Sequence, residues 1–164
     1  MKAYTNVNLV TCDSEFHVYR EGLLVVEDDR IAYCGPYDQA WLEKCSETVD
    51  YEGVWIMPGL VNCHTHSAMT LLRGIRDDSN LHEWLENYIW PAESQFTAEV
   101  TTKAVQFALA EMLLSGTTTF NDMYNPHGVD IKQVYQAVRQ SGMRCYFSPT
   151  LFTSPAETAE ETLI

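Results

Sequence analysis

The sequence runs PGLVNCHTH from Pro58 to His66, and this stretch decides how the rest of the chain is interpreted. Side chains alternate across an extended strand, so His64 and His66 are expected on one face, roughly 7 Å apart along the backbone. Two imidazoles at that spacing can bind one metal ion, at about 2.0–2.1 Å per nitrogen if the metal is zinc. The preceding run VWIM, residues 54–57, is typical of a strand buried on both faces of a parallel sheet. We therefore expect a buried strand that carries two metal ligands at its carboxyl end.

The composition indicates a folded, acidic protein. Hydrophobic residues make up 46% of the 164 residues, charged residues 20%, and the formal net charge is -13. This charge disfavours nucleic acid and anionic membranes as partners, so a small-molecule partner is expected. The chain has no apolar segment as long as a membrane span, and its first residues lack the apolar region of a signal peptide. We expect a cytoplasmic protein, and the five cysteines, which form no C-x-x-C pair, fit a reducing compartment.

Short strands and turns are predicted for residues 1–57, which indicates a small β module. From residue 58 onward, strands are predicted to alternate with helices, which is typical of consecutive right-handed βαβ units. The predicted elements of this second part are a helix after Asn80, a helix over 97–114, a strand over 117–123, a helix over 131–138 and a strand over 143–147.

Local signals mark where these helices begin and end. Asn80 is a plausible N-cap with Glu83 three residues later, Pro91 is expected to stop or kink that helix, and Gly116 is placed to end the next one. A further helix start is predicted at Ser154, roughly two to three turns before the last residue. We expect from this pattern that the chain is cut, and not finished, at its end.

Several motifs of the chain together resemble those of the amidohydrolase superfamily. The residues that carry the resemblance are PGLVNCHTH at 58–66, Met69, Leu72-Arg73-Gly74, Trp90-Pro91-Ala92-Glu93 and Gly116-Thr117-Thr118-Thr119. Within the superfamily, the sequence is most similar to the methylthioadenosine/S-adenosylhomocysteine deaminases and their chlorohydrolase-like relatives. The similarity covers essentially this whole chain, but only the first part of such an enzyme.

The resemblance implies an α/β fold, namely the N-terminal portion of a metal-dependent (β/α)8 TIM barrel preceded by strands of a small β-sandwich. Residues 1–57 would belong to the sandwich and residues 58–164 to the first βα units of the barrel. A complete TIM barrel typically needs about 250 residues, so residues 58–164 cannot close one.

The resemblance also implies roles for individual residues. His64 and His66 match the first two metal ligands of the family, and Glu93 matches the acid that contacts the ribose hydroxyls of adenosine-type substrates. The other ligands and the acid/base glutamate of the family come from later strands, so no catalytic acid/base residue is expected here. The implied cofactor is a divalent metal, with zinc favoured, although imidazole also suits iron and nickel. The implied substrate is a nucleoside such as S-adenosylhomocysteine or 5'-methylthioadenosine, which would release ammonia, and a homo-oligomer is a family expectation.

Two alternatives stay open. Residues 148–151 contain no arginine of the kind that some family members use there, so guanine, cytosine or a triazine is an alternative substrate. The second alternative is of a different class, an incomplete, non-catalytic fragment or interaction module, because two imidazoles are only half of a zinc site. Three further side chains receive structural interpretations: Trp90 is expected in the core, Cys63 is expected to pack opposite His64, and Asp122 is either functional or a cap.

Overall fold

The structure, a computed structural model, describes residues 1–124 and 131–149. It divides into two compact units, one spanning Met1–Pro58 and the other starting at Gly59. The helix start predicted at Ser154 lies outside the described residues.

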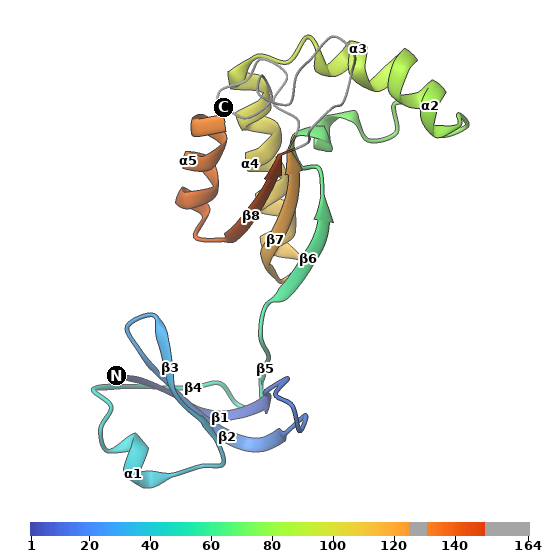
Figure 1. Ribbon diagram of the computed structural model, residues 1–164. Coiled ribbons are helices and arrows are strands. Elements are labelled where there is room, and N and C mark those ends of the chain that lie inside the picture. Colours follow the sequence, from blue (N-terminus) through green and yellow to red (C-terminus); the bar gives the residue numbers. More distant parts are fainter. Residues whose placement is uncertain (125–130, 150–164) are drawn as a thin grey trace. The chain divides into compact units, whose positions relative to one another are not determined.

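A mixed β-sheet forms the first unit (Figure 1). Its elements are β1 (Lys2–Val10), β2 (Val18–Glu27), β3 (Arg30–Gly35), α1 (Gln39–Leu42), β4 (Glu47–Asp50) and β5 (Trp55–Ile56). The strand order is β3-β2-β1-β4, and β5 also pairs with β1. β2 is antiparallel to β1 and β3, whereas β4 and β5 run parallel to β1.

This sheet packs two separate buried clusters. β1 contributes to both of them, because its odd-numbered side chains change faces partway along the strand. Ala3 near its start packs with one buried cluster, and Val7 and Leu9 pack with another. All three positions are odd-numbered, so strict alternation would put them on one face. The register of β1 against β2 shifts between Tyr4 and Val7, next to Asn6 with its φ of 54°. A shift of this kind re-aims the residues that follow it.

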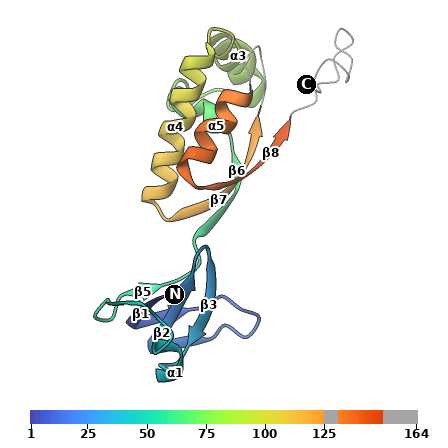
Figure 2. The same cartoon turned by 90° about the vertical axis from the view of Figure 1, so that its left-hand side faces the viewer.

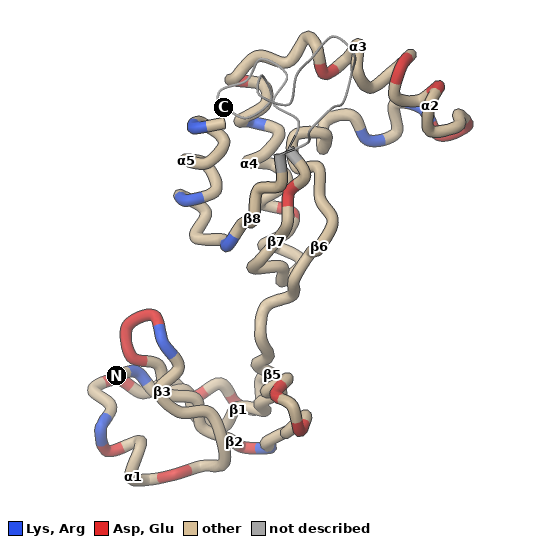
Figure 3. Tube along the Cα trace, in the orientation of Figure 1, with Lys and Arg blue, Asp and Glu red and all other residues tan. Residues whose placement is uncertain are grey.

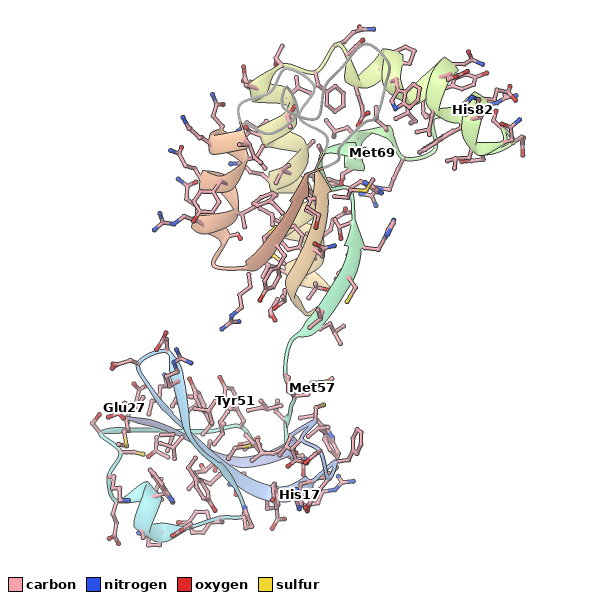
Figure 4. The ribbon with its side chains drawn as sticks, in the orientation of Figure 1. His17, Glu27, Tyr51, Met57, Met69 and His82 are labelled. Atoms are coloured by element: carbon pink, nitrogen blue, oxygen red, sulfur yellow. The ribbon has the colours of Figure 1, made fainter. Side chains whose placement is uncertain are left out.

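The prediction of one buried strand running from residue 54 to His66 was wrong. Trp55 and Ile56 form β5 in the first unit, and Met57, labelled in Figure 4, is 54% exposed. Strand β6 begins only at Leu60, after Pro58, which has no N–H to donate to a ladder. β6 is also largely exposed, and within the described residues it pairs only with β7.

Three parallel strands and their connecting helices form the second unit. The strands, in the order β6-β7-β8, are β6 (Leu60–Thr65), β7 (Thr117–Tyr124) and β8 (Arg144–Pro149). Between them lie η1 (Ser67–Leu72), α2 (Leu81–Trp84), η2 (Leu85–Ile89), α3 (Trp90–Glu93), α4 (Ala98–Leu114) and α5 (Ile131–Ser141). Figure 2 shows α4 and α5 together against the sheet, where Val105, Leu109, Phe120, Val134 and Val138 form a buried cluster. The predicted strand–helix alternation is confirmed.

The helix signals predicted at Asn80 and Gly116 are confirmed, and Pro91 does not stop its helix. Asn80 Oδ1 accepts from the Glu83 N–H at 3.0 Å, and Gly116 follows α4 with a φ of 84°. The helix continues past Pro91 to Glu93, because the preceding turn, η2, has π-helical spacing and so accommodates a residue without an N–H. Trp90 is 37% exposed, so its predicted core position was wrong. Among the described helices, none is both long and apolar enough to cross a membrane.

Candidate metal and substrate site

A β-bulge shapes the end of β6, where the two histidines lie. Asn62 pairs with Phe120 and Thr65 with Asp122, so three steps along β6 match two steps along β7. The Asn62 side chain braces this irregularity: its Oδ1 accepts from the His64 N–H at 3.2 Å and its Nδ2 donates to Thr65 Oγ1 at 2.6 Å. Bulges commonly re-aim a side chain near a functional site. Asn62 therefore sets the local backbone on which His64 lies.

His64 and His66 are brought together in space. Their ring centroids are 5.0 Å apart, and the rings meet edge to face with an interplanar angle of 84°. His66 is the first residue after β6, and its Nδ1 lies 3.3 Å from the carbonyl oxygen of Met123. A carbonyl can only accept, so Nδ1 carries the proton in this contact. The Nε2 atom of a neutral His66 is then free to bind a metal.

Asp122 is the buried acid next to this pair. Its carboxylate accepts from the Ser67 N–H at 2.9 Å and from the Ser67 hydroxyl through a second, short hydrogen bond. Burial raises the pKa of Asp122, while the hydrogen bonds from Ser67 and the nearby His66 act in the opposite direction. The sequence left the role of Asp122 open between function and capping. Its position at the carboxyl end of a parallel strand was the only signal for either role.

Neighbouring strand ends are joined by Asn121. Its Oδ1 accepts from Ser148 Oγ at 2.9 Å, and its Nδ2 lies at 3.5 Å from the Cys63 carbonyl oxygen, so β6, β7 and β8 meet here. The Cys63 side chain is exposed, so the prediction that it packs was wrong.

A hollow of about 550 Å³ lies beside His66. Thr65, Met69, Trp84 and Met112 are among its lining residues, and Figure 4 labels Met69 on η1 close to the strand ends. An ion pair between Arg73 and Glu111, both of which line the hollow, ties the loop after η1 to α4.

Glu93 is placed differently from the histidines. It is the last residue of α3 and is half-buried. Among the described residues, it is not one of those that line the hollow beside His66. The structure therefore brings His64 and His66 together, and it places Glu93 at the end of α3.

Whether a metal ion fits here depends on the side chains that could bind it. In the described part of the chain, no group of three or more His, Cys, Asp or Glu side chains could hold a metal ion. The pair itself fits a shared metal, because two imidazoles bound to one tetrahedral ion at about 2.0–2.1 Å would have ring centres roughly 5 Å apart. The observed separation of 5.0 Å matches that value. The spacing of the His64 and His66 rings is thus compatible with a shared metal ion.

Known proteins resemble this chain in both sequence and structure. Residues 55–163 match the amidohydrolase family. The chain is 44% identical over 162 residues to a 5-methylthioadenosine/S-adenosylhomocysteine deaminase of Bacillus cytotoxicus. The aligned region covers 99% of this chain and 37% of that protein. The curated relatives of Bacillus cereus and Bacillus anthracis are likewise covered over 37% of their length. The chain therefore spans little more than a third of these relatives.

Solved structures give the same picture. An adenosine deaminase from Xanthomonas campestris with bound zinc superposes with a TM-score of 0.83 at 29% identity, covering 98% of this chain and 37% of that one. The atrazine chlorohydrolase of Arthrobacter aurescens complexed with zinc has a TM-score of 0.77 at 21% identity, covering 90% and 35%, and shows a likeness of fold alone. Both of these solved structures contain zinc.

Proposed function

Because this chain belongs to the amidohydrolase family, we propose that it forms the N-terminal part of a metal-dependent hydrolytic deaminase. The observation that carries the proposal is the pair of His64 and His66 rings, 5.0 Å apart at the carboxyl end of a parallel strand. The substrate would be an adenosine-type nucleoside such as S-adenosylhomocysteine or 5'-methylthioadenosine, which loses ammonia. The 44% identical deaminase and the adenosine deaminase neighbour support this substrate class.

The two units would have separate places in the whole enzyme. Residues 1–57 would contribute strands to a small β-sandwich, and residues 58–164 would supply the first βα units of a TIM-barrel catalytic domain. The parallel order β6-β7-β8 with helical connections supports the second assignment. In TIM barrels the functional groups lie at the carboxyl ends of the strands, and β6 ends beside both histidines.

His64 and His66 would hold a divalent metal, with zinc favoured over iron or nickel. A metal bound at this site would lower the pKa of a water molecule toward neutrality and so supply the nucleophile. The residues of this chain would orient the ligands: the Met123 carbonyl accepts from His66 Nδ1 and so leaves Nε2 available to a metal, while Asn62 holds the His64 backbone. The remaining ligands and the proton-transferring acid are expected outside the described residues.

Glu93 would bind the substrate and not transfer the proton. A carboxylate can accept hydrogen bonds from two adjacent hydroxyls, as a ribose presents them. The acidic charge supports a small molecule over nucleic acid, since Asp and Glu occur on both units and the formal net charge is -13 (Figure 3).

The decisive experiment measures ammonia release by the protein that the complete reading frame encodes. S-adenosylhomocysteine and 5'-methylthioadenosine are compared with guanine, cytosine and a triazine under the same conditions. Turnover of either nucleoside is expected. Turnover of only guanine, cytosine or the triazine would replace the substrate assignment, and no turnover at all would favour a non-catalytic role. The 164-residue chain alone is expected to bind zinc weakly and to release no ammonia, because it holds two ligands.

A further inference from the structure

We propose that Asp122 is a positioning residue for the metal ligand His66 and acts through Ser67. Two consecutive residues of β7, Asp122 and Met123, hold the two residues that follow β6, Ser67 and His66. The proposal rests on the proposed function, because His66 is taken as a metal ligand. It goes further in assigning a role to a side chain outside the ligand set.

The contact between Asp122 and Ser67 is fully buried. Both side chains have a relative exposure of 1%, and the carboxylate accepts from both the backbone N–H and the hydroxyl of Ser67. The Ser67 N–H is the first of η1, so it has no partner within the helix. Loss of the acceptor would leave these donors buried and unpaired, which costs more than a typical hydrogen bond is worth.

This contact fixes the peptide that joins His66 to Ser67. His66 has φ −125° and ψ 75°, so the chain bends there as it passes from β6 into η1. Asp122 holds the C-terminal side of this bend, and the Met123 carbonyl holds the His66 ring. Position and ring orientation of His66 are therefore both set by β7, whose Phe120 is completely buried in the core.

His64 lacks a comparable restraint on its ring. Its backbone N–H donates to Asn62, but within residues 1–124 and 131–149 its ring makes no hydrogen bond. His66 is thus the ligand whose geometry is set before metal binding. Groups that orient a ligand in this way typically change metal affinity by about 10- to 100-fold when they are removed.

The test separates positioning from simple stabilisation. Asp122→Asn keeps the size of the side chain and one acceptor oxygen, and Ser67→Ala removes only the hydroxyl contact. Thr97→Ala is the matched control, because Thr97 accepts from the Val100 N–H as the N-cap of α4, remote in sequence from His66. All variants are made in the protein of the complete reading frame. The two readouts are the zinc dissociation constant, by chelator competition, and the ring 15N signals of His66 in histidine-labelled, zinc-free protein.

Asp122→Asn is expected to weaken zinc binding by about 10- to 100-fold and to shift the His66 signals away from a single Nδ1–H tautomer. Ser67→Ala should have a smaller effect in the same direction, and Thr97→Ala should lower stability without changing either readout. Wild-type zinc affinity and unchanged His66 signals in Asp122→Asn would overturn the proposal, as would an equal loss of affinity in Thr97→Ala. If wild-type protein binds no zinc, the proposed function fails, and the His66 signals alone still decide whether Asp122 positions the ring.

Discussion

Gly59 lies against Thr118 so closely that no side chain fits between them: an ideal Cβ added to Gly59 would be 2.7 Å from the Cβ of Thr118, with the other Thr118 side-chain atoms nearer still. Real Cβ atoms essentially never approach that closely. The Leu60 N–H donates to the Gly116 carbonyl at 2.9 Å at the same place, so the close approach lets β6 begin beside β7.

Gly59→Ala is therefore expected to destabilise the second unit by about 1–3 kcal/mol, the usual cost of overpacking. The free energy of unfolding in urea measures the change. Thr118→Ala in the same background should recover part of the loss, because it removes the nearest of the clashing atoms. If Gly59→Ala is as stable as wild type, β6 and β7 can move apart at this point without cost, and the prediction is wrong.

Replacement of either His64 or His66 by alanine is expected to abolish tight zinc binding and deaminase activity in the protein of the complete reading frame. Each substitution removes one imidazole from a pair whose rings are 5.0 Å apart. His82→Ala is the control: His82 lies on α2, labelled in Figure 4, and is exposed beside Glu86 at 3.1 Å. Metal content and ammonia release measure the outcome. Retained zinc in both His64→Ala and His66→Ala would remove the metal assignment.

Glu93→Gln is expected to raise KM for the nucleoside roughly 10- to 100-fold, because hydrogen bonds to a charged group contribute about 1.5–3 kcal/mol. The effect on kcat should be smaller, since the residue would position the ribose and not transfer the proton. Glu99→Gln, an exposed acid in the first turn of α4, serves as the control. A large fall in kcat with an unchanged KM would contradict a substrate-binding role for Glu93.

The stability of the first unit should depend on pH through Asp13. The hydrogen bond with the His17 ring holds the pKa of this carboxyl well below its usual range. A lowered folded-state pKa stabilises the fold above the ordinary pKa of an aspartate, and the stabilisation is lost as the pH falls through the folded value. Asp13→Asn should therefore unfold at lower urea than wild type at pH 7, and the difference should shrink below roughly pH 4. Asp29→Asn, in the exposed turn between β2 and β3, is the control. A difference that persists unchanged in acid would show that the charge of Asp13 is not its cause.

Local patterns predicted much of this structure. The cap at Asn80, the glycine after α4 and the parallel strands around α4 and α5 were all predicted, because each depends on a few neighbouring residues. The VWIM run was misassigned for the same reason. An apolar segment carries no mark of which sheet it joins, and Trp55 and Ile56 pair with β1 of the first unit.

The sequence by itself determined that two histidines, spaced two residues apart, follow an extended segment, and that Glu93 ends the WPAE motif. Side-chain periodicity along a strand is a property of the backbone, so the sequence alone was enough to predict that His64 and His66 lie near each other. Only the tertiary structure decided how His66 is held. The pairing of β6 with β7 places Asp122 against Ser67 and the Met123 carbonyl against the His66 ring, across 55 and 57 residues of chain. Which residues become neighbours across a parallel sheet depends on the register of the strands, and here that register includes a bulge that Asn62 braces.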